Sequence, residues 1–316
     1  MMPICAALVL MTTVLEPPSQ DQSERVAERL LKASKARSFD PDTEVDWDAA
    51  PVEGALYMPE RQVSLYGTPL WDTLSLEQRI ELSKHEVSSI AAAGIWFELI
   101  LDQILIRHIY TQDPTTKHVR YALTEIEDEC RHSKMFARMI ETLGTPLYGP
   151  PPAIRRLGTI VKSRARGVEA FAATLIIEEV LDALQREGAR DASVQPLVRQ
   201  VCTIHVAEEA RHLSYARAEL ERDVPKLGRV HLELARLYCA ATARVASRSM
   251  VNPQAYAAIG LDPKKTARIV AKSRARKETE AELAKRLVRF LSDVGLIGGP
   301  TARLWALGGI DLPPRA

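Results

Sequence analysis

The sequence predicts an all-α protein, built as a four-helix bundle with extra helices and an irregular N-terminal arm. Apolar residues recur at helical spacing along most of the chain, and no stretch of four or more residues alternates with a period of two. Long helical segments are joined by short connections, which is typical of an up-and-down bundle. Each half of this bundle holds a long apolar helix followed by a helix that contains the motif E-x-R-H.

The helices follow one another in a clear order. Residues 21–37 are expected to form a short amphipathic helix, and residues 38–74, rich in Pro, Gly and Asp, an extended arm. A capping box, Ser75-x-x-Gln78, should begin a long helix that reaches about residue 112. Helices are then expected from Pro114 to Gly144, from 168 to a stop at Gly188, over 192–223, from Pro225 to Met250, and over 262–294, with a Pro-rich connection at 144–154.

These elements divide the chain into four parts. Residues 1–20 are expected to be disordered or wrongly assigned to the protein, with Met11 as the alternative start. The helix and arm occupy 21–74, the helical-bundle domain occupies 75–300, and a tail rich in Gly and Pro occupies 301–316.

Composition excludes several classes of partner and site. Of the 316 residues, 46% are apolar and 26% charged, which is ordinary for a folded soluble protein, and the net charge of +1 gives no reason to expect nucleic acid or an acidic membrane as a partner. Apart from the apolar N-terminal stretch, no segment is expected to approach a membrane span. The four cysteines form no C-x-x-C pair, so neither a disulfide framework nor a zinc knuckle is indicated, and a reducing cytoplasm is the simplest location.

The two halves share a spacing that indicates a duplicated helical hairpin. Glu129 follows Glu98 by 31 residues, and Glu209 follows Glu178 by the same number. Each second glutamate is followed three residues later by a histidine, and residues three and four apart lie on one face of a helix. A bundle with one Glu on each of two helices and Glu-x-x-His on each of the other two is the pattern of a di-iron carboxylate site.

The predicted site therefore holds two metal ions. Carboxylate oxygens and imidazole nitrogens suit iron, with manganese as the alternative. The central glutamates, Glu129 and Glu209, are expected to bridge the two ions, and the apolar-helix glutamates to be terminal. The expected ligands are Glu98, Glu129, His132, Glu178, His205, Glu209 and His212.

A surface explanation was weighed against this one. A single E-x-x-H on a helix is usually a solvated pair, but here two occur at matched offsets. Glu98 lies within "AAAGIWFELIL" and Glu178 follows "FAATLII", where an unpartnered carboxylate would be costly to bury. The metal site is therefore favoured.

Residues beside the motifs are expected to support the ligands. Metal-bound histidines usually donate their other ring N–H to a carboxylate, so Asp128 and Glu208 should each reach the histidine of the opposite half. Arg131 and Arg211 would balance those acids; the alternative is that Asp128 and Glu208 are surface charges.

His205 breaks the symmetry between the halves. It lies one turn before Glu209, where the first half has Glu125, so one iron is expected to carry an extra imidazole. The alternative is a histidine packed beside the site and hydrogen-bonded to a carboxylate.

Taken together, these residues resemble the p-aminobenzoate N-oxygenase family of di-iron enzymes, with His205 separating the pattern from generic ferritin-like proteins. The resemblance covers about 38–250 and includes the arm sequences "SFDPDTEVDWDAAP" and "YGTPLWDTLS". It implies a ferritin-like fold, a homodimer, and a di-iron centre that uses O₂ to oxidise an amine nitrogen to hydroxylamine, nitroso or nitro. It also implies that Glu129 and Glu209 bridge the irons and that the other five ligands cap them.

The substrate departs from the family's expectation. An aryl carboxylate should need a cationic side chain, and "EVSSIAAAGIWF", before Glu98, has none, so a small aromatic amine is expected but aminobenzoate is not secured. The sequence carries no iron–sulfur or flavin motif, which implies an external electron donor.

Other di-metal classes stay open. A peroxidase or manganese catalase would use similar ligands, and an iron-storage protein is the non-enzymatic alternative, although its subunits are usually shorter. A ribonucleotide reductase radical subunit is disfavoured because Phe136 stands where its tyrosine would be.

Overall fold

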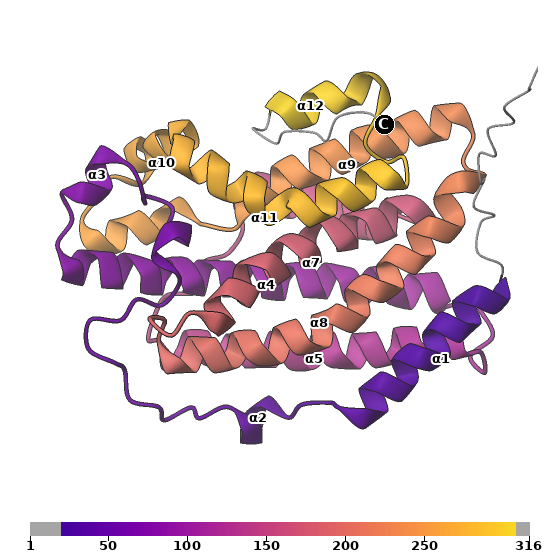
Figure 1. The fold of residues 1–316 in the computed structure, drawn as a ribbon, viewed down its shortest axis with the longest axis horizontal. Helices are drawn as coiled ribbons and strands as arrows, with labels where there is room; N and C mark the ends of the chain where they lie inside the picture. Colours follow the sequence, from indigo (N-terminus) through magenta and orange to yellow (C-terminus); the bar gives the residue numbers. More distant parts are fainter. Residues whose placement is uncertain (1–19, 308–316) are drawn as a thin grey trace, which may run out of the picture.

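The computed structural model describes residues 20–307 and confirms the all-α fold class (Figure 1). Four long helices form the central bundle, and over residues 20–307 there is no strand, only an isolated bridge between Leu56 and Val194. The predictions for residues 1–19, including the start at Met11, lie outside the described residues. The bundle helices are α4 (Leu76–Ile109), α5 (Lys117–Thr142), α7 (Gly167–Arg190) and α8 (Pro196–Asp223).

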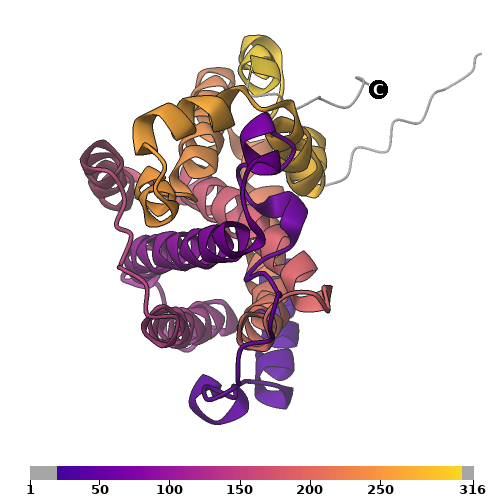
Figure 2. The ribbon, with the colours of Figure 1, turned by 90° about the vertical axis from the view of Figure 1, so that its left-hand side faces the viewer.

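The bundle consists of two helical hairpins. α4 packs on α5 and α7 packs on α8, and the hairpins meet where α5 contacts α8 and α4 contacts α7. Seen end-on in Figure 2, the C-terminal helices stack on one side of this bundle; α9 and α11 both contact α7. The added elements are α1 (Gln20–Ala36), α6 (Pro152–Arg164), η2 (Val224–Lys226), α9 (Arg229–Ser249), η3 (Pro253–Ile259), α10 (Pro263–Lys272), α11 (Arg274–Asp293), η4 (Gly299–Thr301) and α12 (Ala302–Leu307).

The longest helix begins as the sequence predicts. Ser75 accepts a hydrogen bond from the backbone N–H of Gln78, and the Gln78 side chain accepts one from the N–H of Ser75, so both halves of the capping box are present. The apolar run that follows buries most of the middle of α4 between its neighbours. This burial is what carries Glu98 into the core.

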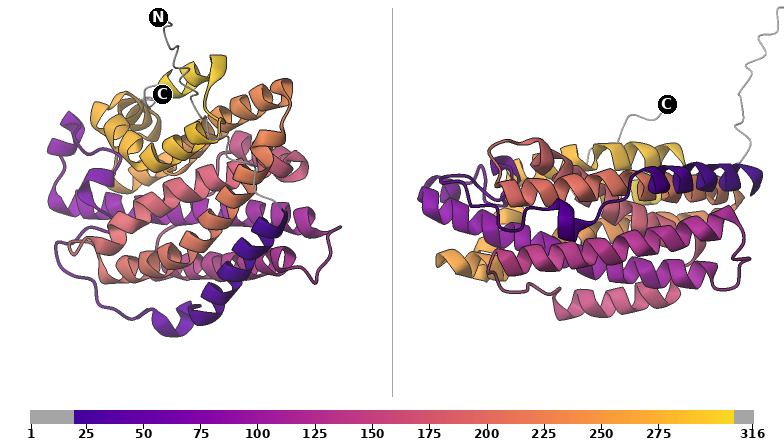
Figure 3. Two further views of the ribbon diagram at one scale, coloured as in Figure 1. Left: turned by 45° about the vertical axis from the view of Figure 1, so that its right-hand side comes forward. Right: turned by 90° about the horizontal axis from the view of Figure 1, so that it is seen from below.

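The arm crosses the outside of α5 and α8. Viewed from below, α1 and the arm run along the face made by these two helices (Figure 3). Gln195 fixes the arm by donating to the carbonyl oxygens of Val52 and Ala55 and accepting from the N–H of Val52. Three short helical turns interrupt the otherwise irregular arm: α2 (Pro41–Glu44), η1 (Glu60–Gln62) and α3 (Pro69–Asp72).

Several predicted boundaries are wrong. Residues 152–164, left without an element, form α6, where Gly158 lets the helix approach Trp96 on α4 closely. Gly188 does not end α7, because it is buried inside the helix beside Cys202 and the helix continues to Arg190.

The C-terminal region also differs from its prediction. The helix expected over 262–294 is broken at Ser273, whose extended backbone ends α10 and whose side chain caps α11 by accepting from the N–H of Arg276. The first part of the tail is helical as η4 and α12.

One described helix is long and apolar enough to cross a membrane, whereas no such segment beyond the N-terminal stretch was expected from the sequence. The 34-residue α4 contains an 18-residue window with a mean hydropathy of 1.6, of which 67% is buried inside the protein. The central helix of a bundle meets the same criteria, so this result alone is weak evidence for a membrane segment.

Candidate metal centre

The structure brings all seven predicted ligands together in the core of the bundle. Each side chain is at most 2% exposed, so none of them is a solvated surface group. They come from all four bundle helices: Glu98 from α4, Glu129 and His132 from α5, Glu178 from α7, and His205, Glu209 and His212 from α8.

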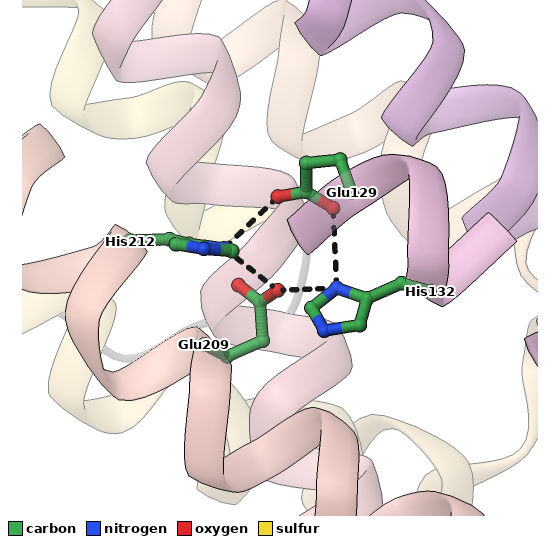
Figure 4. Close-up of side chains that lie close together, drawn as sticks. All are labelled: Glu129, His132, Glu209 and His212. Carbon is green, nitrogen blue, oxygen red and sulfur yellow. Dashed lines mark hydrogen bonds and ion pairs between the residues drawn. The ribbon is translucent and has the colours of Figure 1, made fainter. Parts of the chain in front are cut away.

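Two carboxylates and two imidazoles form the centre of the site (Figure 4). The Nδ1 of His132 lies 3.4 Å from Oε2 of Glu129 and 3.5 Å from Oε1 of Glu209. The Nδ1 of His212 lies 3.0 Å from Oε1 of Glu129 and 3.1 Å from Oε1 of Glu209. Each carboxylate therefore faces a histidine from both halves, which is the arrangement that two bridging glutamates require.

The remaining ligands flank this centre. His205 places Nε2 3.6 Å from Oε1 of Glu98 and 3.5 Å from Oε1 of Glu209. It can share a metal position with Glu98 and His132, and equally with Glu178 and Glu209. His205 therefore belongs to both of these groups and lies within reach of Glu98 and Glu178.

Unsatisfied buried atoms test whether metal ions fit here. Among the described residues, Oε1 of Glu98, Oε2 of Glu178, Oε2 of Glu209 and both ring nitrogens of His205 have no hydrogen-bond partner. A buried polar atom without a partner is costly, and a carboxylate oxygen more so. Oε1 of Glu98 lies 3.6 Å from Nε2 of His205, and Glu178 forms a second group with His205 and Glu209, so bound cations would give partners to carboxylate and imidazole atoms that otherwise have none.

The pKa values of the buried side chains also favour bound cations. Burial, reinforced by repulsion from Glu129, raises the pKa of Glu98 well above its usual value. Burial and the neighbouring Glu209 raise the pKa of Glu178 well above its usual value. Burial also lowers the pKa of His205, which favours the neutral imidazole that a metal binds. Two divalent cations would allow all four carboxylates to ionise in this buried position.

The acids beside the motifs reach across the pseudo-twofold axis. Nε2 of His132 lies 2.8 Å from Oε2 of Glu208, and Nε2 of His212 lies 3.3 Å from Oδ2 of Asp128. In each histidine the other ring nitrogen, Nδ1, faces the bridging carboxylates. A carboxylate behind the ring fixes the orientation and tautomer of a metal-binding histidine.

Two arginines each contact both Asp128 and Glu208. Arg211 donates to Oδ2 of Asp128 at 3.0 Å and to Oε1 of Glu208 at 3.4 Å. Arg131 also contacts both acids. The N-terminal arm also contacts one of these acids, because the N–H of Phe39 donates to Oε1 of Glu208 at 3.2 Å.

Sequence reasoning missed three contacts of the site. Ser133 donates to Oε2 of Glu98 at 2.6 Å and so holds that carboxylate. The ring of Phe136 packs on the imidazole of His205, with centroids 4.9 Å apart. Both lie next to His132 on α5, so their sequence position was the available signal, whereas nothing in the arm sequence indicated the contact of Phe39.

Two further acids, each four residues after an apolar-helix glutamate, have partners of their own. Asp182, at the same offset from Glu178 as Asp102 from Glu98, forms an ion pair with Arg186 at 2.7 Å. Asp102 lies 3.8 Å from the thiol of Cys130.

Comparison with known proteins fixes the family. Residues 20–295 match the family model described as p-aminobenzoate N-oxygenase AurF. The chain belongs to this family. The family match identifies the chain as an oxygenase, and the buried Glu and His side chains are the groups that could hold its metal ions.

Relatives and solved structures extend the comparison. Uncharacterized proteins Rv0885 of Mycobacterium tuberculosis H37Rv and Mb0909 of Mycobacterium bovis are each 31% identical over 233 residues, which is 71% of this chain and 68% of theirs. Structures of two point mutants of an R2-like ligand-binding oxidase, each with an aerobically reconstituted Mn/Fe cofactor, align at 12–13% identity with TM-scores of 0.41–0.42. These alignments cover 92% of this chain and 93–94% of those chains, but similarity at this level is weak, and the assignment depends on the family match.

Proposed function

We propose that this protein is a di-iron oxygenase that uses O₂ to oxidise the amine nitrogen of a small aromatic substrate. The observation that carries the proposal is the central arrangement in which Glu129 and Glu209 each face both His132 and His212. Bound among these ligands, two iron ions would supply the redox chemistry that activates O₂. Membership in the p-aminobenzoate N-oxygenase family supports nitrogen as the oxidised atom.

The chain's own residues hold and shield this centre. Ser133 fixes the carboxylate of Glu98, and the ring of Phe136 limits the positions available to His205. Burial of all the ligands keeps bulk water away from the reacting amine.

An external partner would complete the reaction. Conversion of an amine to a hydroxylamine inserts one oxygen atom, releases the other as water, and consumes two electrons and two protons. The chain has no iron–sulfur or flavin motif, so we propose a separate electron donor. We also propose a homodimer, and iron rather than manganese, on the family resemblance, and a cytoplasmic location on the cysteine usage.

The substrate class follows from the charges around the centre. Two arginines lie closest to the candidate ligands: Arg131, which is partly buried, and Arg211, which is buried. Both are already paired with Asp128 and Glu208, behind the histidines. The α4 stretch that leads to Glu98 carries no Lys or Arg after Lys84. We therefore propose that neutral arylamines are preferred over aminobenzoates.

Product analysis under ¹⁸O₂ tests this proposal. The iron-loaded protein is supplied with a chemical reductant and either aniline or p-aminobenzoate, and N-oxygenated products are identified by mass spectrometry. We expect two irons per chain, label in the product, and higher turnover of aniline. His212→Ala should abolish product, whereas the control His231→Ala, which changes a surface histidine paired with Glu169, should not.

The competing classes predict different results. Iron oxidation without labelled product from any amine would contradict the N-oxygenase proposal. A native mass near 24 chains would indicate storage, and disproportionation of hydrogen peroxide would indicate a catalase.

A further inference from the structure

A second group of ligating side chains lies away from the candidate metal centre. It consists of His108 near the end of α4, His118 at the start of α5, and Glu219 on α8, and each offers a ligand atom within 4.8 Å of the others. His118 and Glu219 are buried, while the His108 side chain is 19% exposed. The group is therefore enclosed but reachable from solvent at His108.

We propose that His108, His118 and Glu219 form a third, mononuclear metal site that binds a divalent transition-metal ion of the zinc(II) class.

The spacing of the two imidazoles fits one shared ion. Nε2 of His108 lies 3.3 Å from Nε2 of His118. Two nitrogens bound to one tetrahedral zinc ion, each at about 2.0–2.1 Å, are themselves about 3.3 Å apart. Two histidines and one carboxylate, with a fourth position open to water, are a zinc ligand set found in catalytic sites.

The neighbouring donors favour unprotonated Nε2 atoms on both imidazoles, whose lone pairs a metal ion could take in place of these hydrogen bonds. The side-chain amide Nε2 of Gln112, which can only donate, lies 3.3 Å from Nε2 of His108. That ring nitrogen is therefore an acceptor, as a metal ligand must be. The hydroxyl of Tyr215 lies 3.1 Å from Nε2 of His118 and can donate there in the same way.

The carboxylate completes the group. Glu219 places Oε2 4.0 Å from Nε2 of His108, while its Oε1 lies 3.6 Å from the other ring nitrogen of His118, Nδ1, so the carboxylate reaches the shared ion from the His108 side. Its orientation is fixed by Arg222, which donates to Oε1 at 2.9 Å and to Oε2 at 2.6 Å. A carboxylate held by an arginine retains lone pairs for a metal and is preorganised to use them.

The surroundings are consistent with neutral imidazoles. Burial, reinforced by His108 and Arg222, lowers the pKa of His118 to about 4. Burial likewise lowers the pKa of His108. Both rings are then uncharged at neutral pH, which is the form that binds metal.

Zinc binding to iron-loaded protein tests the third site. The full chain is first saturated with iron, freed of excess metal, and titrated with Zn²⁺ in equilibrium dialysis. We expect one zinc equivalent per chain in the wild type, and at least a tenfold loss of affinity in His118→Ala and His108→Ala. The control is His231→Ala, whose imidazole has a single acidic partner at the surface. This variant should still bind one zinc ion per chain.

A second variant guards against misfolding of the histidine variants. Glu219→Gln keeps the shape of the side chain and one of its two hydrogen bonds from Arg222 but loses the charge, and it should weaken zinc binding while its circular dichroism matches the wild type. Zinc X-ray absorption of the wild type should report two imidazole ligands. A wild type that binds no zinc beyond its iron, or binding that is unchanged in all three variants, would overturn the proposal.

Discussion

Substitution of Glu208 tests whether the carboxylates behind the candidate histidine ligands strengthen metal binding. Its Oε2 is 2.8 Å from Nε2 of His132, and its Oε1 accepts from Arg131, Arg211 and the N–H of Phe39. Glu208→Ala removes the acceptor that orients His132 and leaves two arginines to share Asp128. Loss of such a partner typically weakens metal affinity about 10–100-fold, or about 1.4–2.8 kcal/mol.

The assay is a competition between the protein and a chelator of known iron(II) affinity under anaerobic conditions. Glu208→Gln should lose less affinity than Glu208→Ala, because its amide oxygen can still accept from His132. Glu127→Gln is the matched control, since Glu127 is an exposed neighbour that also contacts Arg131, at 3.9 Å. If Glu208→Ala binds iron as tightly as Glu127→Gln, the reasoning about the supporting carboxylates is refuted.

Three further predictions concern stability. Gly158→Ala should cost about 1–3 kcal/mol in chemical denaturation, because a Cβ there would lie 2.7 Å from Cη2 of Trp96; an unchanged midpoint would mean that α6 is not packed this closely. Ser75→Ala should lower the free energy of unfolding by about 1 kcal/mol through loss of the capping box, measured against Ser75→Thr, which keeps the cap. Burial raises the pKa of Glu86 to about 7, so its contribution to stability is complete below its unfolded pKa, near 4.5, and is lost as pH rises to about 7. Glu86→Gln should therefore gain up to about 3 kcal/mol relative to the wild type between pH 4.5 and 7.5 in urea titrations, and a difference that does not vary with pH would contradict this.

The residues of the candidate metal centre could be picked out from the sequence because they follow local spacing rules. Glu129 and His132 are one turn apart, and the equal 31-residue offsets identified Glu98 and Glu178 although each lies on a different helix. Burying a carboxylate within an apolar run is costly, so the sequence itself marked the positions where a cation was needed.

The missed features depend on contacts that no local pattern encodes. Gly188 resembles a helix terminator, but it sits inside α7 because the α8 side chain Cys202 packs against it. The break at Ser273 depends on one extended residue that caps the next helix. The group of His108, His118 and Glu219 has no ligand spacing in sequence, because three different helices supply its members.

The contact between Phe39 and Glu208 has a consequence for biosynthesis. The two residues are 169 positions apart, and the arm lies against helices that the ribosome makes much later. The N-terminal segment must therefore wait, undocked, until α8 has emerged and packed. Iron that arrived before that moment would meet histidines whose outer supports are incomplete, so we expect the proposed ligands to bind iron more weakly until the arm has docked.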